Sequence, residues 1–193
     1  VKVYKNTKVD AQMLKDADVD AVILAIGSSP ITIKLEGMDK LQHASAPEVL
    51  RHEVCPKGKV AVIGGGLVGL ETADTLATDG CDVTVLEMKD EIGSDLGSLR
   101  KIAVMMKLQQ MQVKMLPNSK VCKFTEEGIV LEDETLVPCN CAVFAVGFAS
   151  NDSHLLVEEC EKRQIPCRVI GDAKSARRAL DAIAEGFEAA RTL

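Results

Sequence analysis

The chain has 193 residues, of which 47% are hydrophobic and only 3% aromatic, and its formal net charge is −6. This acidic balance and the shortage of stacking side chains argue against a nucleic-acid partner, which would favour basic and aromatic residues. No apolar run approaches the roughly 20 residues that span a bilayer, and no signal peptide is apparent. We therefore expect a cytoplasmic protein without a membrane segment, with one or two domains and a sizeable core.

The cysteines indicate reduced thiols. There are seven of them, an odd number at irregular spacing, which does not suit a disulfide framework. Cys139 and Cys141 are the only close pair, and without a C-x-x-C or a nearby His they predict no metal site. The chain begins at Val1 without Met, so we expect a piece of a longer protein.

The first 57 residues contain short elements separated by turn signals. The predicted elements are a strand over Val1–Tyr4, a helix over Val9–Lys15, an apolar strand over Val19–Ile26 and a short helix over Ala46–His52. The third element runs into Gly27-Ser28-Ser29-Pro30, a stop and turn signal. Ser45 is the expected N-cap of the second helix, with Pro47 in its first turn. Pro56–Lys59 is typical of a linker, and we expect a domain boundary there.

Residues 60 to 87 are the most informative stretch. They contain a β-branched run, a G-x-G-x-x-G turn, a segment without Gly or Pro, a second strand-like run and an acidic residue. In order, these parts are Val60–Ile63, Gly64–Gly69, Leu70–Thr78, Val83–Leu86 and Glu87. A strand buried on both faces, a glycine turn, a helix, a second strand and a terminal acid together make up the dinucleotide-binding unit.

The three motif glycines have separate physical roles in such a unit. Gly64 lets the chain turn sharply off the strand, Gly66 lets a pyrophosphate approach the backbone, and Gly69 lets the helix pack against the strand. The phosphates then lie at the helix N-terminus, where free N–H groups and the dipole favour anions. The predicted nucleotide contacts of this turn are Gly64, Gly65, Gly66, Leu67, Val68 and Gly69.

Glu87 is the expected ribose-binding residue. It lies eighteen residues after Gly69, where its carboxylate can accept hydrogen bonds from ribose hydroxyls. A carboxylate would repel a 2′-phosphate, so the sequence favours NADH, while the Lys89 cation keeps NADPH as the weaker alternative. Met88 and Lys89 beside Glu87, and Gly147 at the end of a later strand, complete the predicted site.

The remainder of the chain predicts a second helix, a strand-rich part and a helical end. We expect a helix whose apolar stripe is Leu99, Ile102, Ala103 and Met106, followed by a strand over Val113–Leu116. A meander of three strands should follow, over Ser119–Thr125, Gly128–Glu132 and Glu134–Val137. A buried strand is then expected over Cys141–Val146. Further on we expect a helix over His154–Lys162, a strand over Arg168–Ile170 that ends at Gly171-Asp172, and a helix from about Ala176 to Leu193 with Leu180, Ile183, Phe187 and Ala190 on its buried face. The last strand and helix have no sheet of their own, so we expect 1–57 and 150–193 to pack together, with 58–149 inserted between them.

The chain resembles the flavoprotein reductases of the pyridine nucleotide-disulfide type, which bind FAD and NAD(P). In particular it resembles the C-terminal part of the multidomain NADH:flavin oxidoreductases that include 2-enoate reductase, 2,4-dienoyl-CoA reductase and trimethylamine dehydrogenase. The matching stretches are DAVILAIGSSP at 20–30, VAVIGGGLVGLETA at 60–73, VTVLEMKDEIGSDLG at 83–97, AVFAVGFASND at 142–152 and VIGDAKSARRALDAIAEGFEAARTL at 169–193.

The resemblance implies an α/β fold and further site residues. An NAD(P)-binding, Rossmann-like domain with a parallel sheet and a β-meander, residues 58–149, would be inserted in a partial, discontinuous FAD-binding-type domain, residues 1–57 and 150–193. Gly171 and Asp172 match the motif whose Asp hydrogen-bonds the ribityl chain of FAD. Ala25 and Gly27 match the family's A-T-G turn, in which Ile26 replaces the Thr and its hydroxyl. Glu71 matches an acidic residue near the nicotinamide, the alternative being a solvated residue on the first helical turn.

The implied parent enzyme passes a hydride from NADH to FAD and reduces activated C=C bonds of the 2-enoate or enoyl-CoA type. Its upstream barrel domain, with FMN and a 4Fe-4S cluster, and the earlier G-x-G-x-x-G unit for FAD are absent from this sequence. We therefore expect the isolated fragment to be inactive, and FAD retention stays open. A non-catalytic nucleotide-binding module or sensor, or a piece of a disulfide reductase, are the alternatives. No catalytic residue is assigned, and the oligomeric state, a homo-oligomer included, stays open.

Overall fold

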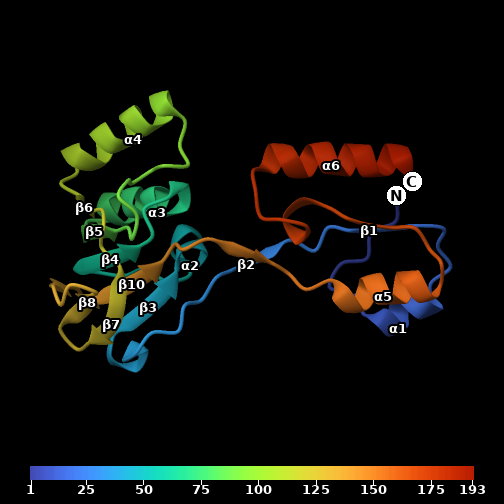
Figure 1. Ribbon diagram of the computed structural model, residues 1–193, viewed down its shortest axis with the longest axis horizontal. Helices are drawn as coiled ribbons and strands as arrows, with labels where there is room; N and C mark the ends of the chain where they lie inside the picture. Colours follow the sequence, from blue (N-terminus) through green and yellow to red (C-terminus); the bar gives the residue numbers. More distant parts are fainter. The chain divides into compact units, whose positions relative to one another are not determined.

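The computed structural model describes residues 1–193, which divide into two compact units (Figure 1). Unit 1 comprises Val1–Ser29 and Phe148–Leu193, and unit 2 comprises Pro30–Gly147. Unit 2 is thus inserted in the sequence of unit 1. No helix is long and apolar enough to cross a bilayer.

Unit 2 contains a five-stranded parallel sheet and a three-stranded antiparallel meander. The order in the sheet is β3-β10-β4-β5-β6, formed by Gln42–Ser45, Cys141–Phe144, Lys59–Ile63, Asp82–Leu86 and Lys114–Leu116. The meander consists of β7 Val121–Thr125, β8 Gly128–Leu131 and β9 Leu136–Pro138. The helices are α2 Ala46–Leu50, α3 Leu67–Thr78 and α4 Ser98–Gln110, with a 3₁₀ turn η1 at Met38–Lys40. The predicted α/β class and parallel sheet are confirmed.

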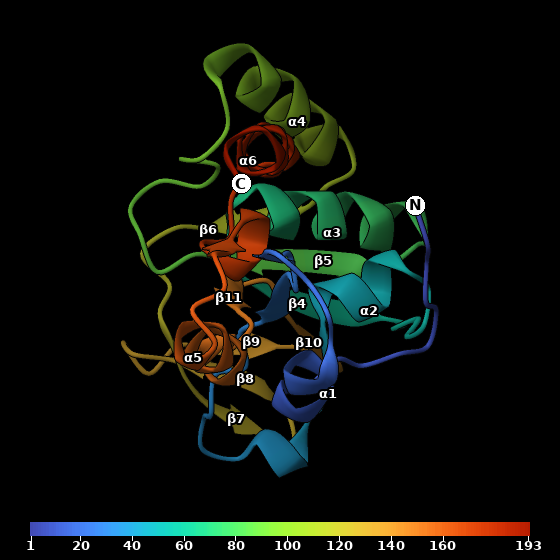
Figure 2. The ribbon, with the colours of Figure 1, turned by 90° about the vertical axis from the view of Figure 1, so that its right-hand side faces the viewer.

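Both faces of the unit 2 sheet are covered. Along β4, Val60 and Val62 face a core that includes residues of α3 and α4, whereas Ala61 and Ile63 face a core shared with the meander. Figure 2 shows α3 and the meander on opposite sides of β4 and β5. This alternation explains the continuous apolar run, because a strand buried on both faces needs apolar side chains at every position.

Residues 30–57 belong to unit 2, whereas the sequence placed them with the flanking domain. β3 pairs in parallel with β10 in the register Gln42 to Cys141, and the Phe124 N–H donates to the Glu36 carbonyl at 2.8 Å. These hydrogen bonds fix the segment to the central sheet and to the meander. The first boundary is therefore at 29/30 instead of 57/58. The predicted Ser45 cap is present as a capping box with Glu48.

The apolar stripe predicted for α4 is wrong, because its members face outward. Leu99, Ile102 and Met106 are 84%, 59% and 57% exposed. The opposite side of the helix packs instead, with Leu108 fully buried and Met105 partly buried in the core on the helix-covered face of the sheet. Both faces of α4 carry apolar side chains, so the sequence pattern did not show which one packs.

Unit 1 has short strands and less core than unit 2. Its elements are α1 Ala11–Asp16, β1 Val22–Leu24, β11 Phe148–Ser150, α5 His154–Lys162, β12 Cys167–Val169, a 3₁₀ turn η2 Gly171–Ala173 and α6 Ala179–Thr192. β1 and β12 pair in parallel, and β2 Ser28–Pro30 pairs with β11. α1 lies beside α5 (Figure 1), where the Arg163 guanidinium donates to the Leu14 and Ala17 carbonyls.

Two predictions for unit 1 are wrong. Val1–Tyr4 is not a strand, because neither two-stranded sheet, β1 with β12 or β2 with β11, pairs with this segment. The face of α6 predicted to be buried is open: Leu180, Ile183 and Phe187 are 74%, 69% and 72% exposed. The buried apolar residues of unit 1 are Leu14, Leu24, Cys160, Ala173 and Ala189.

Candidate functional site

The glycine turn after β4 lies in close backbone contact with the end of β10 and with the first turn of α3. Gly64 has φ +110°, and a Cβ there would lie 2.4 Å from the Ala145 carbonyl oxygen. A Cβ on Gly69 would lie 1.9 Å from the Gly64 carbonyl oxygen. The first turn of α3 therefore packs directly on the end of the strand, an approach that only glycine permits.

A cleft of about 500 Å³ opens beside this turn, at the carboxyl ends of β4, β5 and β10. Parallel sheets bind ligands at this edge. The predicted site residues that line the cleft are Gly64, Gly66, Leu67, Val68, Glu87, Met88, Lys89 and Gly147. Gly65 lies in the loop after β4 and Gly69 in the first turn of α3, and neither lines the cleft.

A second hollow, of about 590 Å³, lies near the amino ends of β3 and β10, beside Gln42 and Cys141. It contains His43, whose ring packs edge-on against Phe144. The glycine turn and the acidic residue do not reach it, so the glycine-turn cleft is the candidate site of unit 2.

Glu87 is fixed by two backbone donors at the end of β5. Its Oε2 accepts from the Gly65 N–H at 2.7 Å, and its Oε1 accepts from the Lys89 N–H at 2.9 Å. Each carboxylate oxygen has a further lone pair for an outside donor. The side chain is thus oriented before any ligand arrives.

Several cleft residues were not predicted. Asp95 lies over the start of α3, where its carboxylate accepts from the Leu67 N–H at 2.9 and 3.0 Å. Ser119 and Lys120 follow β6, and Ile33 comes from the segment assigned to the other domain. The rule that loops after neighbouring parallel strands meet at one edge would have pointed to Ser119, since it follows the strand next to β5.

Glu71 lies outside the cleft lining. Its carboxylate pairs with Arg100 of α4 at 2.8 Å, and both side chains are about half exposed. This position agrees with the alternative of a solvated residue on the first turns of α3.

The predicted residues of unit 1 follow its two paired strands. Ala25 and Gly27 come after β1, and Gly171 and Asp172 come after β12, so both turns lie at the same edge of this small sheet. Asp172 Oδ2 accepts from the Ser28 hydroxyl at 3.1 Å. Ser28 therefore joins the two turns, although it was not among the predicted site residues.

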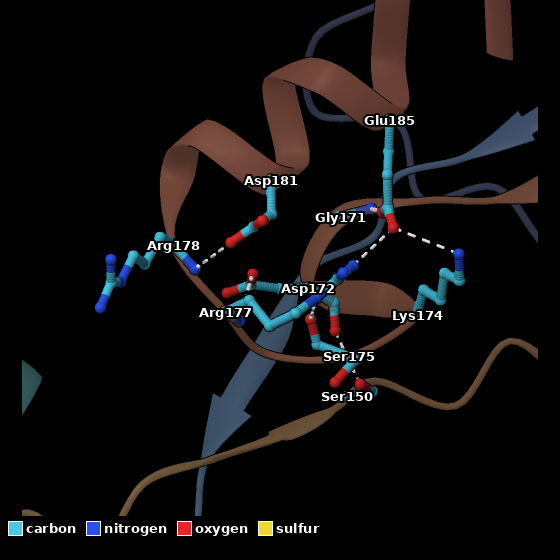
Figure 3. A network of polar contacts seen from close by, with 9 residues as sticks. All are labelled: Ser150, Gly171, Asp172, Lys174, Ser175, Arg177, Arg178, Asp181 and Glu185. Carbon is cyan, nitrogen blue, oxygen red and sulfur yellow. Dashed lines mark hydrogen bonds and ion pairs between the residues drawn. The ribbon is translucent and has the colours of Figure 1, made fainter. Parts of the chain in front are cut away.

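A charged network holds the turn between β12 and α6 (Figure 3). Glu185 accepts from the Gly171 N–H at 2.7 Å, from Arg177 at 2.6 Å and from Lys174 at 3.2 Å. The hydrogen bond from Arg177, followed by that from Gly171, lowers the pKa of Glu185 to about 2. The carboxylate is ionised at neutral pH and ties the start of the turn to α6.

Comparisons with known proteins agree with this arrangement. A family model for pyridine nucleotide-disulphide oxidoreductases matches residues 1–173. A bilirubin reductase of Mediterraneibacter gnavus is 36% identical over 95% of this chain and 29% of its own, and a cinnamate reductase of Clostridium sporogenes is 34% identical over 100% and 29%. The chain thus spans under a third of these relatives.

Solved structures share the fold. A 2-naphthoyl-CoA reductase complex superposes with a TM-score of 0.86 at 24% identity, covering 97% of this chain and 29% of the other. A histamine dehydrogenase from Rhizobium sp. 4-9 superposes with a TM-score of 0.82 at 14% identity, covering 97% and 33%. The glycine turn, the parallel sheet with its meander and the matched family model lead to one conclusion: this chain belongs to the pyridine nucleotide-disulphide oxidoreductase family.

Proposed function

We propose that unit 2 binds NADH in the glycine-turn cleft. One observation supports this proposal most directly. A single cleft is lined by the glycine turn, the start of α3 and the oriented carboxylate of Glu87. The helix start would hold the pyrophosphate and Glu87 would accept hydrogen bonds from the adenosine ribose. Lys89 and Lys120 also line the cleft. Lys120 pairs with Glu132 at 2.6 Å, whereas Lys89 keeps NADPH as the weaker alternative and the oriented Glu87 carboxylate favours NADH.

We propose that unit 1 supplies part of an FAD site. A carboxylate at a strand end suits the polyol of a ribityl chain, and Asp172 is held there by the Ser28 hydroxyl and the Arg177 N–H. Gly27 leaves open space, since a Cβ built on it meets nothing within 4 Å. These residues fit the ribityl end of the flavin, while the adenine end would be held by another part of the parent enzyme.

The parent enzyme, in this proposal, is an NAD(P)H-dependent flavin oxidoreductase acting on activated C=C bonds. When both cofactors are bound, NADH supplies a hydride that the flavin accepts, and the protein contributes binding and orientation. The names of the relatives, a cinnamate reductase and a 2-naphthoyl-CoA reductase, support 2-enoate or enoyl-CoA type substrates.

The finer features of the parent enzyme are also proposals. We place an FMN, a 4Fe-4S cluster and a barrel domain in the part of the parent enzyme that precedes this segment, on the resemblance to 2-enoate reductases. A cytoplasmic location is supported by the seven cysteines, all free. The exposed apolar face of α6 supports a unit 1 that is completed by other parts of the enzyme.

The test is equilibrium titration of the chain with NADH and NADPH, followed by nucleotide fluorescence. We expect NADH to bind more tightly. Glu87→Gln, which keeps the size of the side chain and removes its charge, should narrow the preference for NADH about tenfold, because the carboxylate no longer repels the 2′-phosphate. Glu91→Gln, an exposed carboxylate four residues later, is the matched control and should leave the preference unchanged.

Three outcomes decide the proposal. Tighter binding of NADH with loss of preference in Glu87→Gln supports it. Tighter binding of NADPH would overturn the ribose assignment. Absence of binding of either nucleotide would overturn the nucleotide site as a whole.

A further inference from the structure

The Asp95 carboxylate occupies the position that the proposed site reserves for an anion. Its Oδ1 and Oδ2 accept from the Leu67 N–H at 3.0 and 2.9 Å. Leu67 is the first residue of α3, so this N–H has no partner within the helix. Asp95 Oδ2 also lies 3.1 Å from the point where a Cβ of Gly66 would be. The carboxylate therefore covers the second motif glycine and the helix start together.

Neighbouring residues anchor the segment that carries Asp95. Ile92 is 6% exposed and belongs to the core. The Gly93 N–H donates to the Gly65 carbonyl at 2.7 Å, and Leu96 packs against the same core. Asp95 is itself exposed but lies between the buried Ile92 and Gly93 and the partly buried Leu96, in a turn that is hydrogen-bonded to the glycine loop. The fold therefore sets its position over Leu67.

We propose that Asp95 is an internal occupant of the pyrophosphate position, which the dinucleotide must displace. This inference rests on the proposed nucleotide site. A pyrophosphate at the start of α3 needs the N–H groups there and the open face of Gly66, and Asp95 uses the first and covers the second. Both groups are negative, so their approach is also opposed electrostatically. Asp95 thereby weakens dinucleotide binding and caps α3 when the cleft holds no nucleotide.

Two substitutions separate the charge from the hydrogen bond. Asp95→Asn keeps a side-chain oxygen that can accept from the Leu67 N–H but removes the charge, whereas Asp95→Ala removes both. We expect Asp95→Ala to bind NADH about tenfold more tightly than the unmodified chain, and Asp95→Asn to gain less, because its side-chain oxygen still occupies the Leu67 N–H. The gain should be larger at low than at high ionic strength, because salt screens the repulsion that the variants lack. A purely structural role of Asp95 would produce no such salt dependence.

Asp90→Asn is the matched control, since Asp90 is an exposed carboxylate in the same connection and does not line the cleft. Its NADH affinity should equal that of the unmodified chain. Inorganic pyrophosphate serves as a second probe and should compete with NADH more effectively in both Asp95 variants. Thermal denaturation verifies that each variant is folded.

The outcomes for the nucleotide site and for Asp95 can be told apart. If the unmodified chain binds NADH and neither Asp95 variant binds more tightly, the role of Asp95 is overturned and the site stands. If a tighter Asp95→Asn variant is matched by an equally tighter Asp90→Asn, the effect is one of net charge and the specific role is again overturned. If no form of the chain binds NADH, the proposed site fails and this inference fails with it.

Discussion

Unit 2 and unit 1 use the same elements but differ in how completely they are packed. In unit 2 the parallel sheet has a helical layer on one face and the meander on the other, and Val60 to Ile63 are all at most 6% exposed. In unit 1 the strands form two separate two-stranded sheets, and the apolar face of α6 lies open. An apolar stripe thus identifies the face that a helix can bury, but it does not identify the partner that covers it.

The glycine turns of the two units differ in the same way. Gly64 and Gly69 are in positions where a Cβ would collide with backbone oxygens, whereas a Cβ on Gly27 would meet nothing within 4 Å. Gly27 has φ +74°, so its backbone is that of a turn without the close neighbour that the unit 2 turn has. The glycine turn of unit 2 is therefore packed against backbone of this chain, whereas the glycine turn of unit 1 has unfilled space beside it.

Of the substitutions that test this comparison, Gly69→Ala should destabilise the chain most, because it disrupts the close backbone packing that unit 2 has and unit 1 lacks. The added Cβ would lie 1.9 Å from the Gly64 carbonyl oxygen, which forces α3 away from β4. Overpacking of this kind typically costs about 1–3 kcal/mol, and a clash with backbone belongs at or above the upper end. Chemical denaturation followed by circular dichroism measures the loss, and NADH binding should be lost with it.

Gly97→Ala is the control for that prediction. A Cβ at this position meets nothing within 4 Å, but Gly97 is the N-cap of α4, where Ala is less favourable than Gly. The loss of unfolding free energy should therefore stay within about 1 kcal/mol. Equal stabilities for the two variants would contradict the close packing of α3 on β4.

The sequence was most informative where one segment carries its own pattern. The β-branched run of β4, the glycine spacing and Glu87 after β5 follow one another within 28 residues, Val60 to Glu87, and local rules describe them well. Local rules did not predict Asp95, because its position over α3 depends on how the irregular connection after β5 folds back. The placement of 30–57 was missed because β3 pairs with β10, which is almost 100 residues away in the sequence.

Glu185→Gln tests what holds the turn between β12 and α6 in unit 1. We expect this turn to depend on charge, whereas the glycine turn of unit 2 depends on packing. The pKa of Glu185 is lowered from 4.5 to about 2 by Arg177 and Gly171, so its ionised form is favoured by folding. A group with a lowered pKa stabilises the fold above its unfolded value and loses that contribution as the pH falls through the folded value. The network should therefore hold fully above about pH 4.5 and weaken progressively toward pH 2.

In the unmodified chain, hydrogen exchange of peptides covering 171–185 should increase as the pH falls through this window, after correction for intrinsic exchange. Glu185→Gln should show raised exchange at neutral pH and little further change on acidification. Glu188→Gln, which removes a carboxylate that pairs with Arg191 on the same helix, should behave like the unmodified chain. A Glu185→Gln variant that keeps the acid-dependent increase would show that another group is responsible.

Leu180→Ala should have the smallest effect, and this small effect is informative. Leu180 is 74% exposed, and alanine is the better helix former, so the unfolding free energy of this chain should change by no more than about 0.5 kcal/mol. Leu70→Ala removes the same side chain from a fully buried position in unit 2 and should cost about 2–5 kcal/mol. A loss above about 1 kcal/mol in Leu180→Ala would mean that the face of α6 is already covered in this chain. A near-zero loss here, together with a loss approaching that of Leu70→Ala in the parent enzyme, would show that the same stripe of side chains becomes core only when the rest of the enzyme supplies the opposing surface.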